Sequence, residues 1–515
     1  MAIAVAALVA AFLISYCLTP LVRLLAIRVG FVDRPDGQRK IQTDAVSLGG
    51  GIALLLTTPL VVFLVASWWG PDLWWMARRP GSIIGLAMAA AVLGVVGIID
   101  DSRGMKGSYK LLWQVIAALI ISGTGFKIAA LQLFGYRIPL SFLGNVFTVL
   151  WLLGAINSLN LIDGVDGLAG TVGTIFSLTL GCMALLTDQY LDAMIAFSLA
   201  GSMLGFLRFN YPPATIYLGD TGSMFIGLML GTIALRCSMK QAAGLAFSVP
   251  LAIWTIPMFD SFAALLRRRL TGRSIYATDR GHIHHVLLTR GLNAAQAVRL
   301  IAGLCMLTSV GAVASLYYEN EWLGIISVAF VLGLLIFTKV FGHRELSLVN
   351  ARLHGFGRMI AGQGAQIRET SVNLQGTRRW EEMWGALVDS AERFRVVKMR
   401  LNLSMPRLHE DFYATWQKSG SNRRELLWQA DIPLVVDDMP VGRLCVTGVQ
   451  DAQSASAEMR LFIDFVEGLE ARLHSLIQAE MSRLREPPAP ATAPEDVPSP
   501  LEDEVGSSAD GIYPT

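Results

Sequence analysis

The sequence contains a segment in which two amides and two carboxylates lie within ten residues, Asn157-Ser-Leu-Asn160-Leu-Ile-Asp163-Gly-Val-Asp166-Gly. Carboxylates are hard oxygen ligands for a divalent cation, and amides can hydrogen-bond a polar substrate. The glycines allow the backbone to bend close to a bound group. An ordinary Asn/Asp/Gly turn is the alternative, and the segment alone leaves these two interpretations evenly balanced.

A second segment carries two adjacent carboxylates, Asp100 and Asp101, at the end of an apolar run, with Lys106 close behind. Neighbouring anions raise each other's proton affinity and can divide metal organisation and proton acceptance between them. The alternative is that the two carboxylates only cap the end of a helix. Because three other polar segments are present, the functional interpretation of Asp100 and Asp101 is favoured.

Asp220 lies in a third segment, Leu218-Gly-Asp-Thr-Gly-Ser223, directly before another apolar run. A carboxylate beside glycines at a helix start can hold Mg²⁺ while backbone amides face phosphate, although Asp is also a common helix N-cap. Asn210, ten residues earlier, is a candidate contact for a base or a sugar, or a helix cap.

A fourth segment, Arg280-Gly-His282-Ile-His284-His285, combines three histidines with neighbouring arginines. Histidine and arginine side chains favour binding of a diphosphate through hydrogen-bond donors and positive charge. A zinc site is the alternative, but no cysteine is nearby and the carboxylates of the other segments prefer hard cations.

The composition places these segments in a membrane protein. The chain has 515 residues, 53% hydrophobic and 16% charged, with a mean hydropathy of +0.50, which indicates a polytopic membrane protein and excludes an ordinary soluble one. The five cysteines show neither a disulfide framework nor metal-ligand spacing. Eleven apolar runs are expected to span the bilayer, at about 2–28, 48–68, 82–100, 109–126, 143–160, 166–187, 190–209, 221–238, 243–266, 296–318 and 322–342.

The basic residues predict the orientation. They concentrate in the loops that lie inside if the amino terminus lies outside. With this topology all four polar segments lie on the cytoplasmic side. Carboxylates, amides and a basic histidine loop at one membrane surface together predict a Mg²⁺-dependent phosphoryl transfer in which one substrate is a lipid.

The chain changes character after the last apolar run. Residues 343–378 are expected to form a basic juxtamembrane connector, residues 379–486 a soluble cytoplasmic α+β domain, and residues 487–515 a disordered acidic tail. Within the domain we expect a helix near 379–394, strands near 396–403, 425–436 and 441–448, the last two as a hairpin, and a long helix at about 455–484. Leucines at helical spacing in this last helix favour a packing face or a homodimer seam. Beyond residue 345 we find no catalytic constellation.

At this point residues 1–342 resemble a known family, the polyprenyl-phosphate N-acetylhexosamine-1-phosphate transferases of glycosyltransferase family 4 type. The resemblance is carried by Asp100-Asp101 with Lys106, by Asn157-x-x-Asn160-x-x-Asp163-Gly-x-Asp166-Gly, by Asn210 with Leu218-Gly-Asp220-Thr-Gly-Ser223, and by His282-x-His284-His285. The His-x-His-His form is more similar to the bacterial undecaprenyl-phosphate GlcNAc-1-phosphate transferase branch than to the branch that uses UDP-muramoyl-pentapeptide.

The resemblance implies a role for each motif. Asp166 and Asp220 would hold Mg²⁺, or Mn²⁺, against the diphosphate of a UDP-N-acetylhexosamine, and Asp100 and Asp101 would prepare or deprotonate undecaprenyl phosphate. The remaining residues implied as substrate contacts are Lys106, Asn157, Asn160, Asp163, Asn210, Arg280, His282, His284 and His285. The implied reaction transfers N-acetylhexosamine-1-phosphate and releases UMP, at the bacterial inner (plasma) membrane.

The sequence also departs from the family. Gln42 stands where a histidine is usual, and Ala45 and Ser47 stand where prolines are usual. The carboxyl-terminal 170 residues are extra to the family core, and their pattern is faintly similar to a GAF-type sensory module.

Two other functions fit parts of the pattern. An ion-coupled transporter would also carry carboxylates in many spans, but it would place them near the bilayer midplane, whereas these lie at span ends. A receptor-like protein with an inactive membrane part is disfavoured by the intact acidic residues. Nothing in the pattern indicates a nucleic-acid partner.

Overall fold

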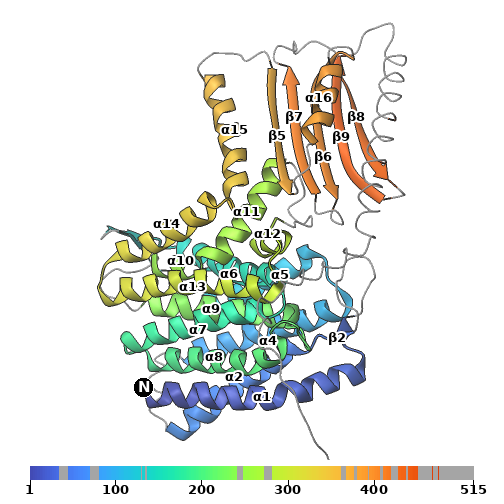
Figure 1. Ribbon diagram of the computed structural model, residues 1–515. Coiled ribbons are helices and arrows are strands. Elements are labelled where there is room, and N and C mark those ends of the chain that lie inside the picture. The colour runs from blue at the N-terminus through green and yellow to red at the C-terminus, as the bar shows by residue number, and fades with distance from the viewer. Residues whose placement is uncertain are drawn as a thin grey trace, which may run out of the picture.

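The structure is a computed structural model. It describes residues 1–33, 45–69, 80–128, 130–133, 136–239, 248–271, 281–360, 367–375, 380–391, 394–405, 410–418, 427–436 and 439–449, together with residues 467 and 474. Up to residue 360 the described chain is mostly helical, and a five-stranded sheet follows (Figure 1). The expected division into helices first and an α+β region later is therefore confirmed.

The helical part consists of α1 Ala2–Val29, α2 Gly50–Trp69, α4 Pro80–Arg103, α5 Gly107–Gly123, α6 Leu143–Ile162, α7 Leu168–Leu186, α8 Tyr190–Asn210, α9 Gly219–Met239, α10 Ser248–Ile253, α11 Thr255–Thr271, α12 Ile283–Thr289, α13 Ala294–Tyr317, α14 Glu321–Phe337 and α15 His343–Ile360. Two short antiparallel strand pairs accompany them, β1 Val32–Asp33 with β2 Val46–Ser47, and β3 Ala130–Leu133 with β4 Tyr136–Pro139.

Among the described residues, seven helices are long and apolar enough to cross a membrane: α1, α2, α4, α6, α7, α8 and α13. Helices α5 and α14 are apolar but shorter. The chain is thus a multi-pass membrane protein, while the count of eleven spans stays a prediction. The run expected at 243–266 contains two helices that meet at Trp254, and Pro257 lacks the backbone donor that would continue one regular helix there.

Two glycines bring three helices close together. A Cβ on Gly97 of α4 would lie 2.4 Å from the Cα atom of Thr221 on α9, and a Cβ on Gly227 of α9 would lie 2.7 Å from the Cα atom of Ile156 on α6. Any larger residue would push these backbones apart. The end of α4, the end of α6 and the start of α9 are therefore held next to one another.

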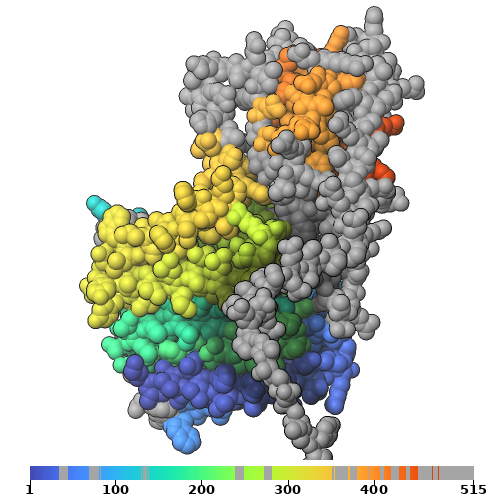
Figure 2. Space-filling view, in the orientation of Figure 1, coloured from blue at the N-terminus to red at the C-terminus, as the bar shows by residue number. Residues whose placement is uncertain are grey.

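The outer surface of the helical part is apolar where lipid would contact it. On α1 the large side chains Val5, Val9, Phe12 and Leu13 are exposed. Figure 2 shows α1 in dark blue on the outside of the stacked helices, with α13 and α14 in yellow on the opposite side. Exposed apolar side chains on the outermost helices are expected of a protein that faces lipid tails.

The sheet has the strand order β5-β7-β6-β9-β8 and is antiparallel throughout. Its strands are β5 Ile367–Gln375, β6 Val396–Met405, β7 Glu410–Lys418, β8 Leu427–Val436 and β9 Met439–Val449, and α16 Trp380–Ser390 precedes β6. Trp384 and Leu387 of α16 share an apolar core with side chains of the sheet, such as Phe412.

The sequence analysis found most of these elements. The helix near 379–394, the three strands and the hairpin of β8 with β9 are confirmed. Strand β7 was missed because residues 411–414 are all buried, which hides the alternation of a half-buried strand. The segment expected as a connector contains α15 and β5, and β5 pairs with β7. The expected helix at 455–484, apart from residues 467 and 474, and the expected tail at 487–515 lie outside the described residues.

Candidate active site

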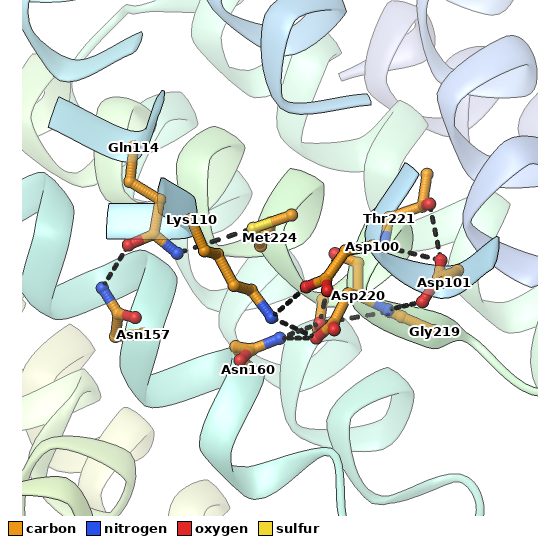
Figure 3. Close-up of polar contacts among 11 residues, drawn as sticks. Asp100, Asp101, Lys110, Gln114, Asn157, Asn160, Gly219, Asp220, Thr221 and Met224 are labelled. Atoms are coloured by element: carbon orange, nitrogen blue, oxygen red, sulfur yellow. Dashed lines mark hydrogen bonds and ion pairs between the residues drawn. The ribbon is translucent and has the colours of Figure 1, made fainter. Parts of the chain in front are cut away.

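An acidic centre lies where α4, α5 and α9 meet (Figure 3). The Nζ atom of Lys110, on α5, lies 2.8 Å from Oδ2 of Asp100 and 2.8 Å from Oδ1 of Asp220. Asp100 lies in the last turn of α4 and Asp220 in the first turn of α9, so one ammonium group joins two carboxylates that are 120 residues apart in sequence. Asp100 and Asp220 were predicted as site residues, but Lys110 was not.

Asp101 points to a different place from its neighbour Asp100. Its Oδ1 atom accepts a hydrogen bond from the backbone N–H of Asp220 at 2.7 Å, and its Oδ2 atom accepts from the N–H and the hydroxyl of Thr221 at 3.1 and 2.7 Å. Asp101 thus caps the amino-terminal end of α9 from another helix, where unpaired N–H groups attract an anion. Gly219 has a φ of +73°, and a Cβ there would lie 2.7 Å from Oδ2 of Asp101. Only glycine fits this turn.

The two asparagines at the end of α6 contact the same region. The amide nitrogen of Asn160 donates to Oδ1 of Asp220 and, at 2.9 Å, to Oγ of Ser223. The amide nitrogen of Asn157 donates to Oε1 of Gln114 at 2.7 Å. Gln114 is buried on α5 and was not predicted. These contacts connect α6 to both α5 and α9.

Asp163 directly follows α6. Burial raises its pKa well above the usual value, and the negative charges of Asp220, Asp101 and Asp166 raise this pKa further. The contacts of Asn160 with Asp220, of Asp101 with Asp220 and of Lys110 with Asp100 bring the 100–101, 157–167 and 218–223 segments together. The roles predicted for these residues stay predictions.

Asp166 and Asn210 hold loops together. Oδ2 of Asp166 accepts from the N–H of Ala214 at 2.9 Å. Oδ1 of Asn210 accepts from the N–H of Gly167 at 3.1 Å, and its amide nitrogen donates to the carbonyl of Ile216 at 2.9 Å. Asn210 is buried, and both ends of its amide are engaged within the protein. This arrangement gives it a positioning role, and its predicted contact with substrate stays a prediction.

The histidine segment is held against α11 by Asp260, a residue of that helix. The Oδ2 atom of Asp260 lies 2.9 Å from Nδ1 of His282, and the Oδ1 atom of Asp260 accepts a hydrogen bond from the N–H of Ile283 at 3.0 Å. Sequence reasoning missed Asp260. A single carboxylate within an apolar run is costly without a partner, and that was the signal available to find it.

His284 brings the histidine segment against the 157–167 segment. It is 1% exposed, and its ring is stacked on that of His282 with an interplanar angle of 4°. A Cβ on Gly164 would lie 2.5 Å from its Nε2 atom. Burial, and then the proximity of His285, lower the pKa of His284 to about 3. This imidazole is neutral at physiological pH, so the positive charge expected of the histidines does not come from His284.

One predicted residue, Lys106, takes part in none of these contacts. Lys106 is exposed and directly precedes α5. Arg280 lies outside the described residues. Their predicted contacts with substrate stay predictions.

The donor set fits magnesium in one specific way. In the part of the chain that the structure describes, no three His, Cys, Asp or Glu side chains are gathered as a ready metal cage. Mg²⁺ is commonly held by one or two carboxylates that are completed by water and substrate phosphates. The oxygen donors of Asp166 and Asp220 suit this mode, because neighbouring carboxylates concentrate negative charge there.

Comparison with known sequences identifies the family. The sequence model described as "Glycosyl transferase family 4" matches residues 83–238. The chain is 31% identical over 355 residues to a probable undecaprenyl-phosphate N-acetylglucosaminyl 1-phosphate transferase of Bacillus subtilis, a match that covers 68% of this chain and 95% of the relative. This chain belongs to glycosyl transferase family 4. The resemblance noted in the sequence is confirmed.

Other members of the family are similar over comparable lengths. A decaprenyl-phosphate N-acetylglucosaminephosphotransferase of Mycolicibacterium smegmatis is 31% identical, with 63% of this chain and 86% of the relative covered. An undecaprenyl-phosphate alpha-N-acetylglucosaminyl 1-phosphate transferase of Pasteurella multocida is 30% identical, with 61% and 88% covered. Family membership gives no support to the alternative of an ion-coupled transporter.

Proposed function

We propose that this enzyme transfers N-acetylglucosamine-1-phosphate from UDP-N-acetylglucosamine to undecaprenyl phosphate and releases UMP, which starts a lipid-linked glycan of the cell envelope. The observation that carries the proposal is the meeting of Asp100, Lys110 and Asp220 where the end of α4 adjoins the starts of α5 and α9. The names of the family relatives supply the substrates.

The proposed setting is the bacterial inner membrane, crossed eleven times, with the amino terminus outside and the acidic centre in the cytoplasm. The distribution of basic residues supports this orientation. At the cytoplasmic surface the acidic centre would meet both a lipid phosphate and a water-soluble nucleotide sugar.

The reaction requires an oxygen of the lipid phosphate to attack the sugar-bearing phosphorus of the UDP-sugar. A new P–O bond forms, and the bond between that phosphorus and the bridging oxygen breaks, so that UMP leaves with the bridging oxygen. Asp100 is the better candidate to accept a proton from the lipid phosphate, since both oxygens of Asp101 accept hydrogen bonds from the start of α9. Lys110 would then face the phosphates with its ammonium group.

Asp166 and Asp220 would hold Mg²⁺, or Mn²⁺, which would neutralise charge on the diphosphate. Asn157, Asn160 and Asp163 would line the space for the nucleotide sugar. The histidine segment with Arg280 would contact the phosphates or the sugar, and the neutral His284 would take part through hydrogen bonding.

The test is an assay of the purified protein with Mg²⁺, undecaprenyl phosphate and a panel of UDP-sugars. We expect release of UMP and formation of a lipid diphosphate sugar with UDP-N-acetylglucosamine, little release with UDP-glucose, and no release after EDTA treatment until Mg²⁺ is added back. Undiminished turnover in EDTA would contradict the metal role. UMP release with none of the UDP-sugars would contradict the proposed function.

A further inference from the structure

One face of α11 supports residues 281–283 of the histidine segment. Asp260 and Arg267 lie two helical turns apart on this face, and both are buried. Asp260 binds His282, as described above. A Cβ on Gly281, the residue before His282, would lie 2.6 Å from the Cζ atom of Arg267. The backbone at the start of the histidine segment therefore packs directly on the guanidinium group.

Arg267 is in turn fixed by the start of α15. Its guanidinium forms an ion pair with Glu345, and both side chains are buried. Its Cζ atom also lies 5.7 Å from the centre of the Phe341 ring. Removing a buried carboxylate from its ion pair with a guanidinium is costly, and the guanidinium is then expected to shift. The place of Arg267 under Gly281 thus depends on Glu345.

The sheet also contacts α11 and α15, close to the ion pair of Arg267 with Glu345. Leu348 of α15 and Tyr413 of β7 are buried together, with Leu270 of α11 packed against them. Figure 1 shows α15 beside β5 at the edge of the sheet, with the end of α11 close to the lower end of α15. Contacts therefore run without interruption from β7 through α15 and α11 to the histidine segment.

We propose that Arg267 is a positioning residue for the histidine segment and that Glu345 sets its position, so that docking of the sheet onto α15 adjusts how the enzyme binds the nucleotide sugar. The inference rests on the proposed function for the identity of that substrate. Arg267 acts through Gly281 and His282, without contacting the reacting atoms.

The experiment changes the two residues that contact the Arg267 guanidinium, Glu345 and Gly281. Glu345→Gln removes the counter-charge, and Gly281→Ala places a methyl group against the guanidinium. Each change is expected to raise KM for UDP-N-acetylglucosamine on the order of tenfold, less than the about 10²-fold cost of a misplaced catalytic group. KM for undecaprenyl phosphate should stay within about twofold, because only the nucleotide-sugar side is disturbed. The double variant should show less than the product of the two effects, since both act on one guanidinium.

The matched control is Glu382→Gln, an exposed carboxylate of α16, which should change neither KM. Arg267→Lys should recover part of the affinity that Arg267→Met loses, because lysine keeps the charge without the planar group. Equal changes of both KM values, or independent effects that multiply in the double variant, would overturn the inference.

Hydrogen–deuterium exchange separates this inference from the proposed function. Glu345→Gln should speed exchange in residues 281–289 while α6 and α9 exchange as in the unaltered protein. This result is expected whether or not the protein uses UDP-N-acetylglucosamine. Unchanged exchange in 281–289 would overturn the inference, and exchange that rises throughout the helices would show a general loss of stability in place of a positioning role.

Discussion

The acidic centre and the histidine segment meet at Gly164 but are held in opposite ways. In the acidic centre charged groups from α4, α5 and α9 satisfy one another through Lys110 and through the cap that Asp101 provides. In the histidine segment His284 is buried, and its Nδ1 atom has no hydrogen-bond partner among the described residues. The acidic centre is therefore held by ion pairs and hydrogen bonds among its own groups. The histidine segment instead depends on a neutral ring and on contacts with α11.

The largest expected effect is a loss of kcat when a carboxylate of the acidic centre is neutralised. The adjacent residues Asp100 and Asp101 are expected to respond differently. Asp100→Asn should lower kcat by about 10²–10⁴-fold, the usual contribution of a general base. Its thermal midpoint should fall less than that of Asp101→Asn, because asparagine keeps an oxygen toward Lys110 and Lys110 keeps its ion pair with Asp220. Asp101→Asn should lower the thermal midpoint as well, because an amide nitrogen would face donors of Asp220 or Thr221, at a cost of about 1–3 kcal/mol. UMP release and thermal unfolding in detergent measure both. Identical behaviour of the two variants would refute the division of roles.

The second prediction concerns pH and the histidine segment. The pKa of His284 is about 3 in the folded protein and about 6.5 when unfolded. Between these values the unfolded chain binds more protons, so stability is lost as the pH falls below about 6.5, by up to about 1.4 kcal/mol per pH unit. His284→Gln should flatten the dependence of the thermal midpoint on pH between 6.5 and 4. A variant with the same slope as the unaltered protein would show that another group is responsible.

The smallest expected effect lies at the contact between the two regions. Gly164→Ala places a methyl group against Nε2 of His284, and overpacking of this kind costs about 1–3 kcal/mol. The thermal midpoint should fall, and KM for the nucleotide sugar should rise. Gly303→Ala on α13 is the control, because a Cβ there meets nothing within 4 Å. If both variants behave alike, the contact between the regions is unimportant.

The sequence was sufficient to name the acidic residues, because adjacent carboxylates and Asn/Asp/Gly segments beside apolar runs are unusual in any membrane protein. It was not sufficient to find Lys110, which stands among Ser108, Tyr109 and Leu111 like any basic residue at the start of an apolar run. Its position between two carboxylates arises only when α4, α5 and α9 pack. For Asn210 the sequence predicted a contact with substrate, and the structure adds that its amide holds two loops together.

The cap that Asp101 provides for α9 has a mechanical consequence. Helices that cross a membrane change their tilt when the bilayer becomes thicker or thinner. The end of α4 is hydrogen-bonded to the first residues of α9, so a tilt of one helix carries the start of the other with it. The spacing between Asp100 and Asp220 is thereby expected to change little with the composition of the surrounding lipid.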